Sequence, residues 1–173
     1  DGSTVEARWH PVSEVRAGRV PLAGWVREAL ERHSPATLQR LSTYGVAIRG
    51  EHVLLTRISA RGHAPGTWTL PGGGVDHGEN PEASLVREFA EETGLRAEIG
   101  TLLGVHDVHF TGTAPTGRHE DFHGVHLVFE VTVGEDEPVV TEPGGTTDAA
   151  EWVPIAEVRA GSRPVFDVVL EGL

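Results

Sequence analysis

Cysteine and methionine are both absent from the 173 residues of this chain. Without cysteine the protein can form neither a disulfide bond nor a thiolate catalytic site. No apolar run approaches the roughly 18 residues of a membrane-spanning helix, and no secretory leader is visible, so we expect a cytoplasmic protein with no membrane partner. Because translation starts with methionine, the start at Asp1 indicates that the natural product was trimmed or cut there.

Basic residues are scarce relative to acidic ones. The chain has 14 Lys and Arg against 26 Asp and Glu, which gives a net charge of −12. This charge argues against a nucleic-acid-binding surface and against an anionic membrane as a partner. An acidic protein that handles phosphate groups needs local cations, and metal ions can supply them. The length favours one domain with a substantial core.

Residues 70–95 form the most informative stretch, a glycine-rich turn followed by a helix. Asn80 is a good N-cap residue, Pro81 suits the first helical position, and Gly94 suits the position just after a helix. These signals predict a helix over residues 81–93.

The predicted helix has two different faces. Glu88, Glu91 and Glu92 fall together on one side, because they are spaced at i, i+3 and i+4. The opposite side is apolar and can face a core. Its residues are Ala83, Leu85, Val86, Phe89 and Ala90.

The three glutamates could form a solvated acidic face or a metal site. Like charges at these spacings cost roughly 0.2–0.5 kcal/mol each. Carboxylates in the last helical turn also meet the negative end of the helix dipole, at roughly 0.3–1 kcal/mol apiece. A divalent cation would reverse the sign of both terms, and three hard oxygen donors suit Mg²⁺ or Mn²⁺. The energetics therefore favour a metal site.

The same stretch resembles the signature of the Nudix hydrolases. Gly73, Glu79 and the run Arg87-Glu88-Phe89-Ala90-Glu91-Glu92-Thr93-Gly94-Leu95 match every specified position of that signature, without gaps. The resemblance extends over residues 42–173, and it implies an α/β fold, an α/β/α sandwich with a mixed sheet. It also implies an enzyme that hydrolyses a phosphoanhydride, in a nucleoside diphosphate linked to another group.

The resemblance also implies roles for the residues of this signature, residues 73–95, which we call the Nudix box or simply the box. Glu88, Glu91 and Glu92 would bind the metal and carry catalysis, with the Gly72 carbonyl as a further ligand. Arg87, counted with the catalytic group, would form a supporting ion pair with Glu79. Gly73 and Gly94 would serve backbone geometry.

A general base and substrate-binding residues have to be found as well. The candidates for the base are Glu88, Glu120, Glu142 and Asp148. Arginines outside the box could contact a substrate phosphate, and the acids of the later loops could contact other parts of the substrate. The substrate-binding candidates are Arg57, Arg61, Arg118, Glu120, Glu142 and Asp148.

Five histidines between residues 106 and 126 attract attention. Their spacing along predicted strands gives no zinc-like pattern, so we interpret them mainly as polar residues of strand faces and loops. They are His106, His109, His119, His123 and His126.

The two ends of the chain contain an internal sequence repeat. Residues 1–21 and 144–164, aligned without gaps, are identical at 11 of 21 positions. Because the second copy resembles the end of a Nudix domain, residues 1–41 are predicted to be an arm that resembles the end of another such domain, followed by a Nudix domain at 42–173. The alternative is a local duplication that serves as an N-terminal cap.

Patterning predicts the remaining elements. Residues 22–32 suggest an amphipathic helix, and residues 34–41 a short helical turn. Strands are expected at 42–49, 52–58, 68–70, 97–109 and 123–133, and a short helix within 159–173. The loops expected to select the substrate are 59–67, 111–122 and 135–149.

Three functions compete at this point. The leading one is Mg²⁺-dependent cleavage of the pyrophosphate in a nucleoside diphosphate derivative, such as ADP-ribose or a nucleotide sugar. The rival activity is cleavage of nucleoside triphosphates. A nucleotide-sensing module without turnover belongs to another class, and the intact glutamates disfavour it. A homodimer formed through an exposed sheet edge is an attractive further expectation.

Overall fold

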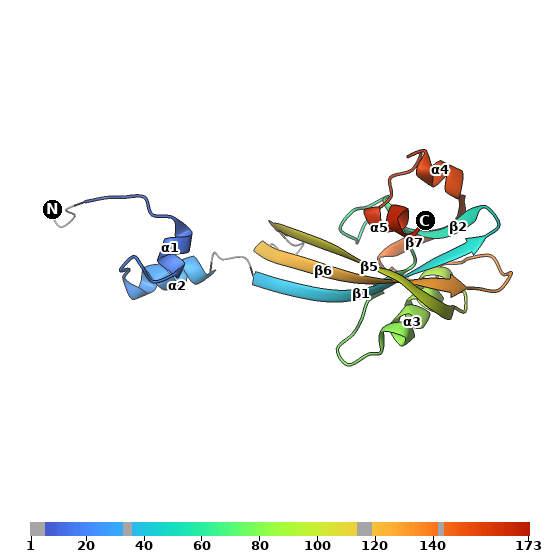
Figure 1. The fold of residues 1–173 in the computed structure, drawn as a ribbon, viewed down its shortest axis with the longest axis horizontal. Helices are drawn as coiled ribbons and strands as arrows, with labels where there is room; N and C mark the ends of the chain where they lie inside the picture. Colours follow the sequence, from blue (N-terminus) through green and yellow to red (C-terminus); the bar gives the residue numbers. More distant parts are fainter. Residues whose placement is uncertain (1–5, 33–35, 114–118, 142–143) are drawn as a thin grey trace. The chain divides into compact units, whose positions relative to one another are not determined.

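The computed structural model describes residues 6–32, 36–113, 119–141 and 144–173 (Figure 1). The chain divides into two compact units, Asp1–Pro35 and Ala36–Leu173, which we call the N-terminal and C-terminal units. No helix in the described ranges is long and apolar enough to cross a membrane.

Between residues 6 and 32, the described part of the N-terminal unit, the chain forms the helices α1 (Val12–Arg16) and α2 (Gly24–Arg32). The helix predicted over residues 22–32 is confirmed and begins at Gly24. The helical turn predicted over 34–41 is wrong for residues 36–41, which open the first strand of the C-terminal unit. Residues 34 and 35 lie outside the described ranges.

The C-terminal unit is a mixed sheet with helices on both faces. Strand order is β3-β2-β1-β6-β5, with β4 pairing to β1 and β7 to β2. β1 and β6 run parallel, whereas the other pairs are antiparallel. The elements are β1 (Ala36–Arg49), β2 (His52–Ile58), β3 (Trp68–Thr69), β4 (Gly72–Gly74), α3 (Pro81–Thr93), β5 (Glu98–Thr113), β6 (His119–Thr132), β7 (Thr147–Pro154), α4 (Ile155–Arg159) and α5 (Asp167–Gly172).

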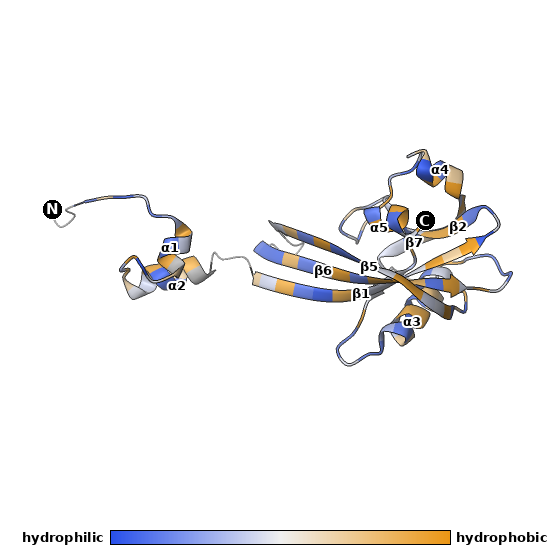
Figure 2. Cartoon of the chain, in the orientation of Figure 1, coloured by the Kyte–Doolittle hydropathy of each residue, from blue (hydrophilic) through white to orange (hydrophobic). Residues whose placement is uncertain are grey.

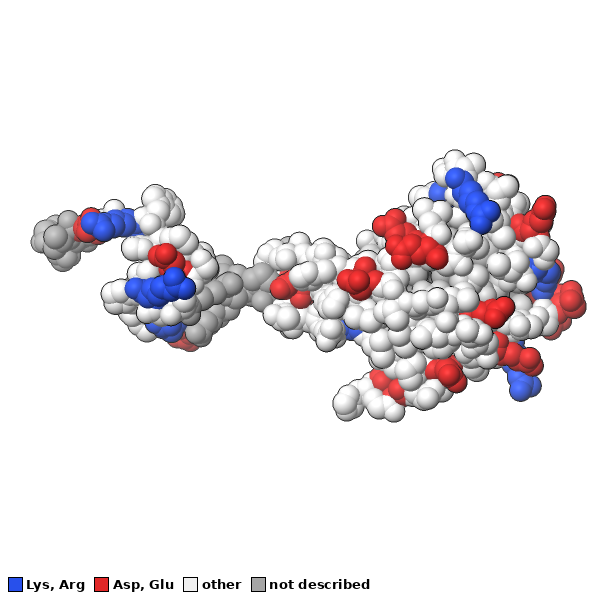
Figure 3. Space-filling view, viewed as in Figure 1, with Lys and Arg blue, Asp and Glu red and all other residues white. Residues whose placement is uncertain are grey.

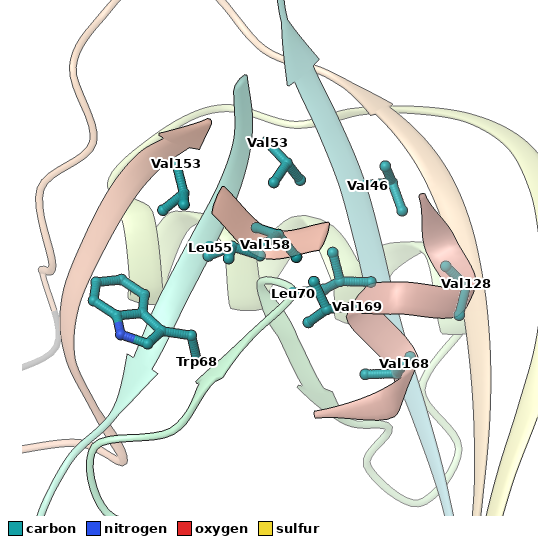
Figure 4. Close-up of a cluster of buried hydrophobic side chains, with 10 residues drawn as sticks. All are labelled: Val46, Val53, Leu55, Trp68, Leu70, Val128, Val153, Val158, Val168 and Val169. Carbon is teal, nitrogen blue, oxygen red and sulfur yellow. The ribbon is translucent and has the colours of Figure 1, made fainter. Parts of the chain in front are cut away.

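Two apolar clusters fix the helices to the sheet. On one face Val158 of α4 and Val168 and Val169 of α5 pack against the strands (Figure 4). On the other face Leu85 and Phe89 of α3 pack against the strands. Figure 1 shows α3 on one side of the sheet and α4 and α5 on the other. The predicted α/β/α sandwich with a mixed sheet is therefore confirmed.

β1, β5 and β6 are longer than the sequence predicted. The β5–β6 register runs without interruption from Gly104↔Val128 to Thr113↔His119, and β1 follows β6 from residue 36 onward. Hydrophobic and hydrophilic residues alternate along these strands (Figure 2), and Phe110 faces Phe122 with ring centroids 5.3 Å apart. Such cross-strand aromatic pairs stabilise a ladder. Most of the loop predicted at 111–122 is thus strand, apart from residues 114–118, which are not described.

The end of the chain also differs from expectation. Residues 155–159 form α4, and residues 167–172 form α5. The segment between them carries a parallel bridge from Val165 to Trp68 of β3. The short helix predicted over 159–173 is therefore confirmed in part: α5 covers residues 167–172, whereas residues 160–166 are not helical.

Candidate active site

Helix α3 begins and ends where its local signals predict. The Asn80 side chain accepts a hydrogen bond from the Ala83 N–H at 3.1 Å, and Pro81 occupies the first turn. Gly94 adopts a left-handed conformation with φ 67° and donates its N–H to the Ala90 carbonyl at 3.1 Å. The helix over residues 81–93 is confirmed, and its far end lies beside the glycines of β4.

The glycines of β4 allow a close approach of backbone to neighbouring groups. Gly72 pairs with Tyr44 and Gly73 with Thr43. Gly72 has φ 142°, and a Cβ there would collide with the Thr43 carbonyl oxygen. A Cβ on Gly73 would stand 2.7 Å from the carboxyl carbon of Glu88. The glycines therefore bring the β4 backbone directly against a box carboxylate.

The buried face of α3 is not the one predicted. Ala83, Val86 and Ala90 are exposed, so their assignment to the core is wrong, whereas Leu85 and Phe89 are buried as expected. The helix is rotated so that polar residues join the buried line. The buried residues of α3 are Ser84, Leu85, Phe89, Glu92 and Thr93.

Glu92 is a buried carboxylate with hydrogen bonds from three sides. It is 6% exposed, and its Oε2 accepts the Gly72 N–H at 2.9 Å and the Thr56 hydroxyl at 3.5 Å. The Thr147 hydroxyl donates to Oε1. Burial raises the pKa of Glu92 to about 7, although the bonds from Thr147 and Gly72 act in the opposite direction. A positive charge nearby would stabilise the ionised form.

Arg87 and Glu79 form a two-pronged ion pair. The Nε and Nη2 atoms of Arg87 each lie 3.1 Å from one oxygen of Glu79, and Nη2 also donates to the Gly74 carbonyl at 3.3 Å. Glu79 accepts the Asp76 N–H at 3.0 Å. The Arg87 hydrogen bond, followed by that from Asp76, lowers the pKa of Glu79 to about 2. The pair ties the loop before α3 to the middle of the helix.

The remaining nitrogen of Arg87 bridges two box carboxylates. Nη1 lies 2.8 Å from Glu88 Oε1 and 3.3 Å from Glu91 Oε2. Two carboxylates thus share one cationic group at the surface of the box, while Glu92 points inward to Gly72. The structure brings Glu88 and Glu91 together and places Glu92 on the inner side of the same helix.

The positions of the box carboxylates can be compared with what the predicted metal ion requires. Within residues 6–32, 36–113, 119–141 and 144–173, no group of three or more acidic or histidine side chains is already gathered as a ligand set. The donors nevertheless fit Mg²⁺ or Mn²⁺ in kind, because they are carboxylate oxygens beside the β4 backbone. Glu88 and Glu91 also already accept one shared cationic group, that of Arg87.

The predicted substrate residues are engaged in different ways. Arg57 Nε lies 2.7 Å from Asp148 Oδ1, and this bond raises the pKa of Arg57. Arg61 donates to the Gly144 carbonyl. Glu120 lies on β6 opposite Gly112. Arg118 and Glu142 lie outside the described residues.

Sequence reasoning missed residues that the sheet brings to the box. The guanidinium of Arg40 lies directly against Gly74, where a Cβ would collide with it. In the described ranges Arg40 makes no ion pair. Tyr44 lies next to Gly72 in the register, and burial raises its pKa to about 12. No local sequence signal points to either residue, because the antiparallel pairing of β1 with β4 brings both to the box.

The histidines pair across strands. His106 and His126 are partners in the β5–β6 register, with Nδ1 atoms 3.1 Å apart, and His109 Nε2 lies 2.7 Å from Asp121. These contacts agree with their interpretation as polar residues of strand faces.

Acidic side chains are spread over the face of the C-terminal unit in Figure 3, with few basic ones among them.

Known proteins share both the sequence pattern and the fold. The NUDIX domain family matches residues 39–170. Nucleoside triphosphatase NudI from Escherichia coli O139:H28 is 35% identical over 96 residues, which are 54% of this chain and 67% of that protein. The crystal structure of a MutT NUDIX hydrolase from Burkholderia pseudomallei has 32% identity and a TM-score of 0.55, and covers 69% of this chain and 85% of its own.

A more distant likeness supports the fold alone. An ADP-ribose pyrophosphatase from Streptococcus suis has 18% identity and a TM-score of 0.54, over 76% of this chain and 88% of its own.

The family match spans nearly the whole C-terminal unit, including the glycines of β4 and all of α3. The chain therefore belongs to the Nudix hydrolase family, as its box predicted, and is a phosphoanhydride hydrolase.

Proposed function

We propose that this chain is a Mg²⁺- or Mn²⁺-dependent pyrophosphohydrolase that cleaves nucleoside triphosphates to a nucleoside monophosphate and pyrophosphate. The observation that carries the proposal is the box itself, in which Glu88 and Glu91 share one cationic group beside the half-buried backbone of β4. Water adds to a phosphorus atom, the anhydride P–O bond breaks, and the proton of the water passes to a carboxylate.

Each box residue has a distinct part in this proposal. Glu88, Glu91 and Glu92, with the Gly72 carbonyl, would hold the metal, which when bound neutralises phosphate charge and polarises the attacking water. Arg87 positions the helix through Glu79. Among the acids considered as general base we favour Glu88, because it is half-buried against Gly73, whereas Asp148 is already paired with Arg57.

Arg40 is the residue that we propose to contact a substrate phosphate. Its exposed guanidinium lies against Gly74, and a guanidinium binds phosphate oxygens in a planar, two-pronged way. Arg57 and Arg61, which the sequence suggested for this role, already bind Asp148 and the Gly144 carbonyl. This difference favours Arg40.

The triphosphate class is supported by the relative with 35% identity, whose name states that activity. The sequence alone placed nucleoside diphosphate derivatives first, with ADP-ribose and nucleotide sugars as examples. The ADP-ribose pyrophosphatase among the structural neighbours supports only the fold, because its identity is 18%. Diphosphate derivatives therefore stay as the second candidate class.

A substrate panel with Mg²⁺ tests the proposal. The purified chain is incubated with nucleoside triphosphates, ADP-ribose and nucleotide sugars, and the products are resolved by phosphorus NMR. Pyrophosphate release from a triphosphate supports the first class, and two monophosphates from ADP-ribose support the second. Glu91→Gln should abolish turnover, whereas Glu98→Gln on β5 serves as a matched control. Binding without turnover on the whole panel would instead indicate a sensor.

A cytoplasmic location and a homodimer stay predictions. Cell fractionation tests the first, and sedimentation velocity of the purified chain tests the second.

A further inference from the structure

The N-terminal unit repeats the end of the C-terminal unit in structure as well as in sequence. The two copies are shifted by 143 residues, the distance from Trp9 to Trp152. With the same shift, α1 at Val12–Arg16 coincides with α4 at Ile155–Arg159. The helix that follows begins at Gly24 in one copy and at Asp167 in the other, again 143 residues apart.

Backbone conformation matches at both ends of the short helix. Pro11 precedes α1 with φ −57° and ψ 135°, and Pro154 precedes α4 with φ −55° and ψ 126°. Gly18 and Gly161 follow the two helices in the left-handed region, with φ 71° and 67°. The repeat is therefore a folded unit with the same turn geometry, and not a chance likeness of composition.

Hydrogen bonds of the two turns also coincide. The Ala17 N–H donates to the Ser13 carbonyl at 3.0 Å, and the Ala160 N–H donates to the Ala156 carbonyl at 3.0 Å. The next pair, from the N–H groups of Gly18 and Gly161 to the valine carbonyls three residues earlier, measures 3.1 Å in both copies.

In the C-terminal unit this segment covers both faces of the sheet: Trp152 packs on the side of α3, and α4 and α5 pack on the other side. Trp152 lies on β7 opposite Leu54 of β2, and Arg49 stacks on its ring at 4.2 Å. Val158 and Val168 then bury against the strands, as Figure 4 shows. The segment needs two things from its partner: an antiparallel strand edge like that of β2 and an apolar face like that around Leu55.

The two tryptophans of the N-terminal unit are uncovered, whereas Val15, the counterpart of Val158, is 9% exposed. Trp9, the counterpart of Trp152, is fully exposed. Trp25, the counterpart of Val168, is 74% exposed, whereas Val168 is 3% exposed. In this chain the edge of β2 is already occupied by β7 from residue 147 to residue 154. Two exposed tryptophans in so short a unit indicate a surface that binds another protein surface.

We propose that residues 6–32 are the closing segment of a second Nudix-type sheet, which precedes them in the natural polypeptide. The partner is thus an upstream copy of this fold that offers a free antiparallel strand edge and an apolar face. Trp25 packs on that face as Val168 does here, and Trp9 lies on the opposite side of the sheet, as Trp152 does here. Applying the shift of 143 residues to Gly73 places the box of the upstream copy about 70 residues before Asp1.

The natural gene and its product test the proposal first. The coding sequence upstream of Asp1 should contain an in-frame Nudix box near that position, and the intact mass of the native protein should exceed that of residues 1–173. A start codon that leaves no room for the box overturns the proposal. So does an upstream copy that already has its own closing segment.

Hydrogen exchange on the natural polypeptide tests the contact itself. Amide exchange in residues 12–30 should be at least about tenfold slower there than in the chain of residues 1–173. Trp25→Ser should restore fast exchange in those residues only, whereas Arg27→Ser, two residues further along α2, should not. Equal exchange of residues 12–30 in the two proteins would refute the proposal, even if an upstream box exists.

Discussion

At the scale of single residues, the burial of Glu92 sets the electrostatics of the box. Glu88, Glu91 and Glu92 lie on the same helix. Among them Glu92 is buried, with its carboxylate hydrogen-bonded to Gly72, Thr56 and Thr147. A buried carboxylate is costly to ionise unless a positive charge compensates it. The stability of the protein should therefore depend on the charge state of this residue.

Glu92→Gln should stabilise the metal-free protein above neutral pH. Because the pKa of Glu92 is raised from its ordinary 4.5 to about 7, the folded state binds a proton that the unfolded state releases. This contribution to stability is complete below pH 4.5 and is lost as the pH rises through about 7. Glutamine keeps the neutral state, so the variant should gain up to about 3 kcal/mol at pH 8 and nothing at pH 4.

Urea unfolding in the presence of a chelator measures this difference at each pH. Glu98→Gln is the control, because Glu98 is exposed. A variant that is less stable than the parent at pH 8 would contradict the prediction.

Arg40 and Arg57 should differ in their effect on catalysis. Arg40→Ala removes a guanidinium from Gly74, so we expect the KM for the substrate to rise about tenfold or more, as for the loss of a charge-assisted hydrogen bond. Arg57→Ala breaks a half-exposed pair with Asp148 and should change KM less than about threefold. Steady-state kinetics compare the two variants. Equal effects would argue against Arg40 as a phosphate contact.

At the scale of elements, one glycine fixes the distance between α3 and the sheet. A Cβ on Gly45 of β1 would lie 2.5 Å from Phe89 Cε2 and 2.6 Å from Val131 Cγ2. Phe89 is fully buried and is flanked on the helix by the residues of the box. The position of α3 on the sheet, and of Glu88 and Glu92 with it, therefore depends on the absence of a side chain at Gly45.

Gly45→Ala should therefore destabilise the C-terminal unit by about 1–3 kcal/mol, because overpacking displaces Phe89. Gly104→Ala on β5 is the matched control, since no heavy atom lies within 4 Å of a Cβ there. Thermal unfolding followed by circular dichroism measures both. A Gly45→Ala protein with an unchanged melting temperature would show that α3 can shift without cost.

At the scale of the whole molecule, the acidic charge opposes the binding of a polyphosphate. With a net charge of −12, the approach of an anionic substrate is unfavourable unless cations neutralise it. Sodium ions screen exposed charges, but they do not bridge carboxylates and phosphates as a divalent ion does.

Removal of divalent ions should abolish turnover. A chelator is expected to reduce activity at least about a hundredfold, and Mg²⁺ or Mn²⁺ should restore it, whereas raising NaCl should not. Pyrophosphate release measured during a Mg²⁺ titration provides the test. Full activity in excess chelator would exclude a metal-dependent mechanism.

The helix that carries the box could be predicted from the sequence because its signals are local. Asn80, Pro81 and Gly94 each act within one turn of α3, and the structure confirms the helix from residue 81 to residue 93. The family followed from the same stretch, since its pattern of glycine, arginine and glutamate is contiguous. Local hydrogen bonding and backbone preference need no knowledge of the distant chain.

Residues that depend on distant partners could not be placed in this way. The length of β1 follows from its pairing with β6, about 84 residues later, so residues 36–41 looked helical in isolation. The rotation of α3 that exposes Val86 and buries Ser84 is set by packing against the sheet.

The sequence by itself thus determined the helix, its capping, the order of the acids and the family. Only the tertiary structure decided that Glu92 lies inside, because its partners Thr56 and Thr147 stand 36 and 55 residues away and reach it through β2 and β7. It also brought Arg40 to Gly74 through the pairing of β1 with β4. Burial and charge compensation depend on contacts between segments that are far apart in the chain, so no short stretch of sequence predicts them.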